Sequence, residues 1–216
     1  MPSGRPRLTQ VLDELLVAER GEAMLGELPK HPDQHKIQVT QACRWQRRPD
    51  TGEMTQTDTL LRNNEAYAAS FHKGELPLAP GRKLAVLACM DARLDPARVL
   101  GLEEGDAHVI RNAGGVVTDD ALRSLAISQH LLGTEEIVLI HHTGCGMLTF
   151  TDEEFAQKLE SETGSRPEWR AHAFSDIEGA VRDGIERIRT SPFVPRTDSV
   201  RGFVYEVETG RLREVG

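Results

Sequence analysis

Three short runs of apolar residues recur in the second part of the chain, with helix-like stretches between them. The runs are KLAVLAC (83–89), AHVIRNAGG (107–115) and EIVLIHH (136–142). A continuous apolar run of this length is typical of a strand buried on both faces, which is the usual state of a strand in a parallel sheet. Because helices separate these runs, the pattern predicts an α/β fold with a mostly parallel central sheet flanked by helices.

Local signals mark the ends of the expected helices. Asp95 followed by Pro96 is a typical start, with Asp at the N-cap and Pro at the first helical position, and predicts a helix within 95–102. The segment TDDALRSLAISQHLLG (118–133) opens with Thr and two acids and closes on Gly, as a capped helix does. The remaining elements expected are helices near 152–162 and 176–189 and a C-terminal hairpin within 200–216 that turns at Thr209-Gly210.

The first 53 residues follow a different pattern. Apolar residues from Leu8 onward fall at helical spacing, so a helix is expected up to Gly21, whereas 28–53 has no sustained period and reads as loop or linker. We therefore expect two parts. Residues 1–53 form an N-terminal arm or extension, partly helical or disordered, and 54–216 form the compact domain. If the start codon was placed too far upstream, the arm is not part of the native protein.

Composition narrows the functional classes. The net charge of −8 argues against a nucleic-acid partner, which normally requires a basic face. All the net acidity lies in 54–216, with 18 Lys/Arg against 26 Asp/Glu, whereas 1–53 holds eight of each. No stretch approaches the roughly 18 apolar residues of a membrane span, and the N-terminus is not a secretory signal. With three cysteines, a disulfide framework is not expected, and the cytoplasm is the expected location.

Side chains capable of chemistry gather where the expected strands end. CMDARLDP follows the first strand and HHTGCG follows the third, and the carboxyl ends of parallel strands share one edge of a sheet. Cys89, His142 and Cys145 are donor types that suit zinc. Two thiolates and one imidazole leave the fourth tetrahedral position for water, as in a catalytic site. The sequence therefore predicts a zinc ion held by these three residues.

Two alternatives to a metal site stay open for the cysteines. A buried cysteine often packs as a small apolar residue, and a cysteine at a strand end can be a reactive thiol. The expected meeting of both motifs at one sheet edge favours the metal.

On an alternating strand His141 points away from His142, so a hydrogen-bonded core histidine or a surface histidine is expected there. Cys43 has no partner motif and is expected to have no function.

Asp91 and Arg93 lie two and four residues after Cys89. A carboxylate beside a guanidinium stays ionised because the cation lowers its pKa. In isolation such a pair is a simple salt bridge in a turn. Beside a zinc ligand it favours catalysis, with the aspartate accepting a proton or hydrogen bond from zinc-bound water or hydroxide and fixing its orientation.

Together these motifs resemble those of the β-class carbonic anhydrases. That family carries C-x-D-x-R after one strand and H-x-x-C-G after a later one, which are here residues 89–93 and 142–146. The intervening VIRNAGG (109–115) is similar to the family's Arg-Asn stretch. The resemblance covers about residues 54–216 and is closest to the short branch found in actinobacteria.

The resemblance implies a carbonate dehydratase, a lyase that interconverts carbon dioxide and bicarbonate through a zinc-bound hydroxide. It implies one Zn²⁺ per subunit on Cys89, His142 and Cys145, with Asp91 and Arg93 as the catalytic dyad. It also implies a homodimer or a dimer of dimers with the active-site cleft at the subunit interface.

One position departs from the family pattern. Many members have a glutamine nine residues before the first cysteine ligand, where it helps to hold the substrate, and here that residue is Pro80. We expect backbone N–H groups around Gly114 and Gly115 to position the substrate instead. For the proton shuttle, His108 and His130 are candidates by residue type only.

Three alternatives remain for the function. Some enzymes of the same branch hydrolyse carbonyl sulfide or carbon disulfide, and the motifs do not separate these substrates because a hydroxide on zinc attacks either carbon. A zinc- or bicarbonate-binding module with little turnover is the second, and intact Asp91 and Arg93 argue against it. A thiol-redox role is the least favoured, because Cys89 and Cys145 lie far apart in the sequence and each has a metal-site neighbour.

Overall fold

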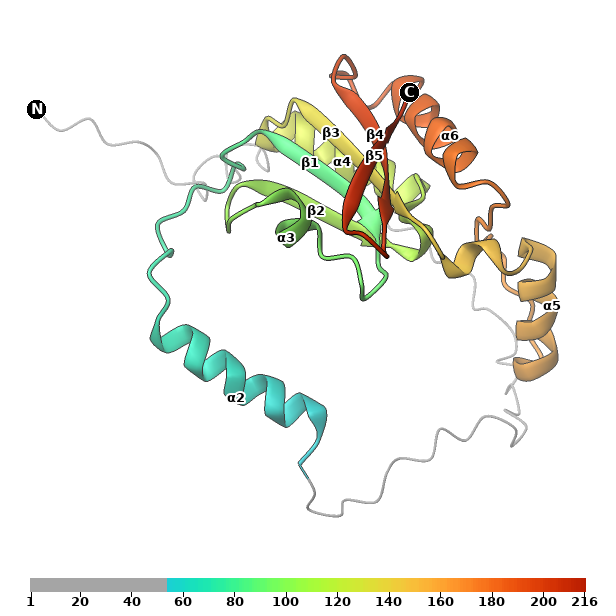
Figure 1. Cartoon of the computed structure of the whole chain (residues 1–216), viewed down its shortest axis with the longest axis horizontal. Helices are drawn as coiled ribbons and strands as arrows, with labels where there is room; N and C mark the ends of the chain where they lie inside the picture. The colour runs from blue at the N-terminus through green and yellow to red at the C-terminus, as the bar shows by residue number, and fades with distance from the viewer. Residues whose placement is uncertain (1–53) are drawn as a thin grey trace, which may run out of the picture. The chain divides into compact units, whose positions relative to one another are not determined.

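The computed structural model describes residues 54–216, whose centre is a five-stranded sheet with the strand order β2-β1-β3-β4-β5 (Figure 1). The first four strands run parallel, and β5 is antiparallel to β4. The predicted α/β fold, with a mostly parallel sheet and a C-terminal hairpin, is confirmed. The helix and irregular stretch expected within 1–53, and Cys43 with them, lie outside the described residues. The strands are β1 (Leu84–Cys89), β2 (Ala107–Asn112), β3 (Glu136–His142), β4 (Val200–Glu206) and β5 (Arg211–Val215).

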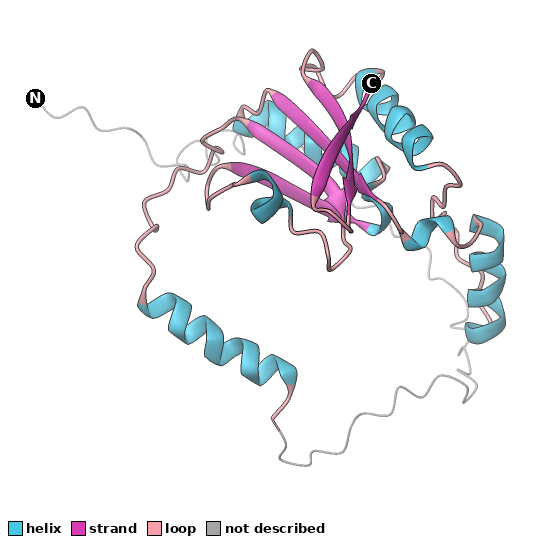
Figure 2. Cartoon of the chain, viewed as in Figure 1, coloured by secondary structure: helices cyan, strands magenta, loops and turns pink. Residues whose placement is uncertain are grey.

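Helices alternate with the strands, and several begin and end where the sequence predicts (Figure 2). Asp95 caps the helix that starts at Pro96, accepting a hydrogen bond from the backbone N–H of Ala97 at 3.1 Å. The next helix is capped by Thr118 and ends at Gly133, whose φ of 71° is readily adopted by glycine. The helices of the described part are α2 (Gln56–Ala69), α3 (Pro96–Leu100), α4 (Asp119–Leu132), α5 (Asp152–Thr163) and α6 (Ile177–Arg189).

The sheet is covered on both faces at its centre. On one face, Leu125 of α4 and Val181 of α6 join Leu139 of β3 in a buried cluster. On the other face, Val86 and Ile140 pack in a second cluster with residues of α3 and of the loops around it. Because β1 and β3 lie between these two layers, most of their residues are buried, which explains their continuous apolar sequences.

β2 is less buried than its sequence predicts. It pairs with β1 alone and forms one edge of the sheet in the described part of the chain. Val109 and Arg111 are exposed and the other β2 residues are only half-buried. The edge position, rather than any local signal, therefore determines the exposure of this strand.

α2 has no buried residue in the described structure. Its N-cap is Thr55, which forms a capping box with Asp58, so its start is determined locally. Its apolar side chains Leu60, Leu61 and Tyr67 are exposed. Within residues 54–216 no helix is both long and apolar enough to cross a membrane.

Candidate metal centre

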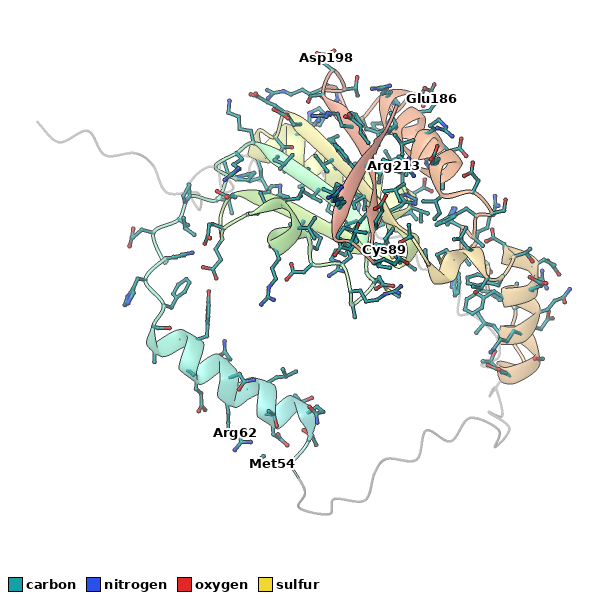
Figure 3. All side chains as sticks on the ribbon, viewed as in Figure 1. Met54, Arg62, Cys89, Glu186, Asp198 and Arg213 are labelled. Carbon is teal, nitrogen blue, oxygen red and sulfur yellow. The ribbon has the colours of Figure 1, made fainter. Side chains whose placement is uncertain are left out.

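The two central strands bring the predicted ligands to one edge of the sheet. Cys89 is the last residue of β1 (Figure 3), and His142 is the last residue of β3. The strands are parallel, with Ala88 of β1 opposite Ile140 of β3, so both end at the same edge. After His142 the chain turns at Gly144, whose φ of 60° is easily adopted by glycine, and Cys145 follows directly.

The three residues predicted as zinc ligands form one buried cluster. The thiol sulfurs of Cys89 and Cys145 and a ring nitrogen of His142 all lie within 4.8 Å of one another. The exposed fractions are 3% for Cys89, 0% for His142 and 4% for Cys145. Three donors gathered in a buried space are suited to holding a single metal ion.

His142 has a free nitrogen aimed at this cluster. Its Nδ1 lies 2.9 Å from the carbonyl oxygen of Thr143, which can only accept, so Nδ1 is the donor. Its Nε2 is buried, has no hydrogen-bond partner among the described residues, and lies 3.6 Å from Oδ2 of Asp91. A ring fixed through one nitrogen, with the other unpaired, is the usual arrangement of a metal-binding histidine.

The pKa values of the three side chains in the cluster are also consistent with the binding of a cation. The hydrogen bond from the Cys145 thiol lowers the pKa of Cys89 to about 4, and the same bond raises the pKa of Cys145. Burial lowers the pKa of His142, but the neighbouring Cys89 sulfur and the carbonyl of Thr143 outweigh burial and raise it. A divalent cation would displace the protons held here, as metal binding to thiols and imidazoles does. Thiolate and imidazole donors suit zinc.

Asp91 and Arg93 form the ion pair that the sequence predicts. Nε of Arg93 donates to Oδ1 of Asp91 at 2.9 Å, and an Nη donates to Oδ2 at 2.8 Å. These contacts, with the backbone N–H of Arg93, hold the pKa of the Asp91 carboxyl well below its usual range. The same Nη also donates to the carbonyl of Gly144 at 3.1 Å. Arg93 therefore connects the loop that follows Cys89 to the turn that precedes Cys145.

Gly115 lies directly beside Cys89. Its φ is 69°, and a Cβ at this position would lie 2.7 Å from the backbone nitrogen of Cys89 and 2.9 Å from the carbonyl oxygen of Ile140. At Gly114 a Cβ would instead meet the side chains of Met147 and Phe174. The turn Ala113–Gly115 is therefore packed against the ends of β1 and β3, next to the candidate centre.

The other histidines of residues 54–216 take no part in the cluster. His141 is buried as a core residue 5.3 Å from the ring of Phe174, which fits the expected core histidine. Burial lowers its pKa to about 4, which keeps it neutral. His108 is opposite Ala85, near the start of β1, and bonds to Ser128. His130 is in the last turn of α4, away from the carboxyl edge of the sheet.

Arg111 reaches the site although its sequence context does not predict a role for it. Its guanidinium donates to the backbone carbonyls of Cys89, Asp91 and Leu94. VIRNAGG marks the stretch, but only the pairing of β2 with β1 brings this side chain to the loop.

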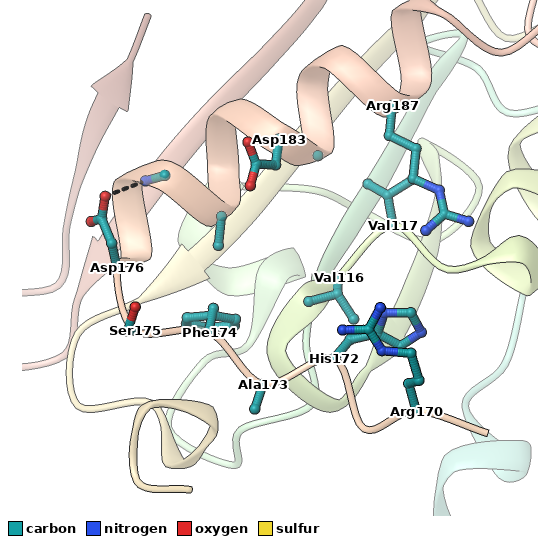
Figure 4. Close-up of a pocket in the computed structure, with 13 residues that line it drawn as sticks. Val116, Val117, Arg170, His172, Ala173, Phe174, Ser175, Asp176, Asp183 and Arg187 are labelled. Carbon is teal, nitrogen blue, oxygen red and sulfur yellow. Dashed lines mark hydrogen bonds between the residues drawn. The ribbon is translucent and has the colours of Figure 1, made fainter. Parts of the chain in front are cut away.

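A separate pocket of about 440 Å³ lies beside α6 (Figure 4). Arg170, His172 and Arg187 line it, whereas no member of the metal cluster does. Phe174 lines this pocket and contacts His141, so the pocket adjoins the core behind the candidate centre without being part of it.

The fold and the donor set define the class of protein, an α/β protein with a candidate Cys₂His metal centre at the carboxyl edge of a mostly parallel sheet. The family model for carbonic anhydrases matches residues 84–178. β-Carbonic anhydrase 1 of Mycobacterium tuberculosis is 57% identical over 162 residues, covering 75% of this chain and 99% of the relative. The chain belongs to the β-carbonic anhydrase family.

Two further relatives extend the comparison. The crystal structure of carbonic anhydrase from Streptococcus mutans matches with a TM-score of 0.72 and 44% identity, covering 76% of this chain and 99% of that chain. The carbon disulfide hydrolase of Acidianus is 38% identical over 181 residues, covering 73% of this chain and 87% of the relative. The resemblance stated from the motifs is confirmed, and with it the assignment to a family of lyases.

Proposed function

We propose that the chain catalyses the reversible hydration of carbon dioxide to bicarbonate and a proton, with one zinc ion per subunit on Cys89, His142 and Cys145. The observation that carries this proposal is the buried cluster of these three donors within 4.8 Å of one another. The name of the 57% identical relative, β-carbonic anhydrase 1, supports the same reaction.

The three side chains would hold zinc in three of its four tetrahedral positions and leave the fourth for water. Zinc would supply the nucleophile by lowering the pKa of that water from about 15.7 towards neutrality, so that hydroxide is available at working pH. Two thiolates would balance the charge of the cation. Burial of all three residues limits the access of other water to the site.

Asp91 and Arg93 are proposed to orient the nucleophile. Oδ2 of Asp91 lies 3.6 Å from Nε2 of His142, so the carboxylate is next to the position where the donors converge. Being ionised, Asp91 would accept a hydrogen bond from the nucleophile and so orient it towards carbon dioxide. Arg93 fixes the carboxylate through two side-chain contacts and prevents it from rotating freely.

Gly114 and Gly115 are proposed to line the substrate position. Gly115 packs beside Cys89, and the side chains of Met147 and Phe174 lie close to Gly114. Backbone N–H groups next to apolar side chains suit a small, linear, apolar molecule whose oxygens gain negative charge during attack.

We also propose a homodimer or a dimer of dimers. α2 exposes Leu60, Leu61 and Tyr67, and the edge strand β2 exposes Val109. Exposed apolar side chains on a helix and an exposed strand edge both favour association with another subunit. The two unpaired thiols of the site suit a reducing compartment, and the cytoplasm is the proposed location.

The test is stopped-flow hydration of carbon dioxide by the purified, zinc-loaded full chain at alkaline pH. We expect a rate in proportion to bound zinc. Cys145→Ser should lose both zinc and activity, whereas the matched variant Cys43→Ser should keep both. A protein with one zinc per subunit and no acceleration would be a binding module, and the proposal would be wrong.

Carbon disulfide hydrolysis is the second candidate, because a 38% identical relative carries that name. The same preparation can be assayed for release of hydrogen sulfide from carbon disulfide and from carbonyl sulfide. A kcat/KM for either sulfur substrate above that for carbon dioxide would favour the second candidate over the first.

A further inference from the structure

Arg111 of β2 makes all its hydrogen bonds to the backbone of one loop. Its Nε donates to the carbonyl of Cys89 at 3.0 Å, and an Nη donates to the same carbonyl at 2.8 Å. The same Nη lies 2.8 Å from the carbonyl of Asp91 and 2.8 Å from that of Leu94. No carboxylate of the described residues forms an ion pair with this guanidinium, so backbone carbonyls are its partners.

The loop held in this way carries the first candidate ligand and both members of the dyad. It begins at Cys89, includes Asp91 and Arg93, and ends at Leu94, just before the N-cap of α3. Its backbone makes few other regular contacts. The N–H of Met90 extends the pairing with β2 by bonding the carbonyl of Asn112 at 2.9 Å, and the N–H of Leu94 bonds the carbonyl of Asp91 at 3.1 Å.

Three carbonyl oxygens that converge on one point repel one another unless hydrogen-bond donors, such as those of a cation, lie between them. A guanidinium is suited to this position because its donors form a planar fork and its charge is permanent. A lysine ammonium is a single point on a flexible stem and cannot reproduce the paired contact that Nε and Nη make with Cys89. The conformation of the loop therefore depends on the shape of the guanidinium as well as on its charge.

We propose that Arg111 is a positioning residue that fixes Asp91 relative to Cys89, and thereby the carboxylate relative to the metal. Its effect on turnover rests on the proposed function. Its effect on the geometry of the metal site does not, because the contacts are to the loop itself. Arg111 acts through the loop, because its hydrogen bonds go to backbone carbonyls and not to the side chains of the candidate ligands.

The experiment compares the full chain with Arg111→Met, which removes the donors, and Arg111→Lys, which keeps the charge. Arg98→Met is the matched control, since Arg98 lies on α3 close to the loop and its side chain is 90% exposed. Each protein is loaded with Co²⁺ to record its visible absorption spectrum and its affinity against a competing chelator. The zinc forms are assayed for kcat and KM, and thermal unfolding is measured for all proteins.

We expect Arg111→Met to bind one metal ion with roughly tenfold weaker affinity and with shifted cobalt bands, and its kcat to fall about tenfold to a hundredfold. KM should change less than kcat, because the contacts of Arg111 are with the loop that carries Asp91. Arg111→Lys should show the same spectral shift with a smaller loss of kcat. Arg98→Met should match the wild type in every measurement.

A wild-type cobalt spectrum and wild-type affinity in both Arg111 variants would overturn the proposal, whatever the turnover. If Arg111→Met fails to fold, Arg111→Lys decides, and a wild-type spectrum in that variant overturns it equally. If the wild type proves inactive on carbon dioxide, the proposed function fails, while the spectra and affinities still decide the role of Arg111.

Discussion

Asp91 keeps its negative charge because of its immediate neighbours. The side chain and the backbone N–H of Arg93 both donate to its carboxylate and hold its pKa well below the usual range. The carboxylate is therefore ionised at any pH at which the protein is expected to work. In the proposed reaction Asp91 can accept a hydrogen bond, but it is a poor proton donor.

Asp91→Asn should separate metal binding from turnover. The amide has nearly the same size, but its NH₂ group faces the donors of Arg93 and it accepts hydrogen bonds weakly. We expect full zinc content and a kcat lowered about a hundredfold, as for loss of a positioned acid–base group. Metal analysis and stopped-flow assays test this, with Asp120→Asn, which breaks an exposed pair with Arg123, as the control. Near-normal turnover would refute the role of Asp91.

At the scale of elements, the centre depends on how tightly the turn Ala113–Gly115 packs against β1 and β3. At Gly115 a Cβ would lie 2.7 Å from the nitrogen of Cys89, closer than real Cβ atoms approach backbone. The turn can approach the strand ends only because this residue has no side chain. The same contact transmits any shift of the turn to the first candidate ligand.

Gly115→Ala should destabilise the protein by about 3 kcal/mol or more, through a clash with backbone added to a strained positive φ. Gly133→Ala is the matched control, because its φ of 71° is nearly the same and nothing lies within 4 Å of its Cβ position. That control should cost only about 1 kcal/mol. Denaturant unfolding measures both. Equal losses in the two variants would contradict the close packing of Gly115.

Asp152 ties α5 to the chain before α6. Its carboxylate accepts from Nε of Arg170 and from the backbone N–H of Ala173, each at 2.8 Å. Burial raises its pKa, but these two donors outweigh burial and lower it below the usual value of 3.8. Because the folded pKa is depressed, the stabilisation is present above the unfolded pKa and is lost as the pH falls below it.

Asp152→Asn should therefore lower stability by about 1–2 kcal/mol at pH 7. The difference from the wild type should shrink as the pH falls below 3.8 towards the lower pKa of the folded carboxyl, where the wild-type side chain becomes protonated. Urea unfolding of both proteins across this range measures the difference, with the exposed Asp198→Asn as a control that should follow the wild type. A difference that stays constant down to pH 3 would exclude the ionic contribution.

At the scale of the whole molecule, two surfaces of the described part lack a cover. α2 has no buried residue, and β2 forms an edge of the sheet. An exposed strand edge and an apolar helix surface both favour association with another chain. The proposed oligomer gives these surfaces a partner.

The double variant Leu60→Glu/Leu61→Glu should dissociate the oligomer, because it places two charges on the exposed apolar surface of α2. Light scattering should report a lower mass, while circular dichroism stays unchanged since neither residue is buried in the subunit. Leu78→Glu, at an exposed position outside α2, is the control and should keep the wild-type mass. An unchanged mass in the double variant would remove α2 from the interface.

Deleting residues 1–53 should leave the fold and the turnover largely intact. All the predicted ligands and both members of the dyad lie beyond this segment, and the match to the family begins at residue 84. Thermal melting and rate assays on the shortened chain test this expectation. A large loss of stability or of kcat would make the arm part of the functional domain.

The sequence by itself determined the types and order of the elements of the described part, because the signals involved are local. Asp95-Pro96 and Thr118 with Gly133 mark helix ends within a few residues. The apolar runs of β1 and β3 indicate strands, and the strand ends carry the three candidate ligands and the dyad.

Tertiary structure alone decided which contacts form between these elements. The edge position of β2, the orientation of Nε2 of His142 and the hydrogen bonds of Arg111 to the loop depend on strand order and side-chain orientation. These features depend on contacts between residues that are far apart in the sequence. No local sequence pattern indicates that such residues will be neighbours in the fold.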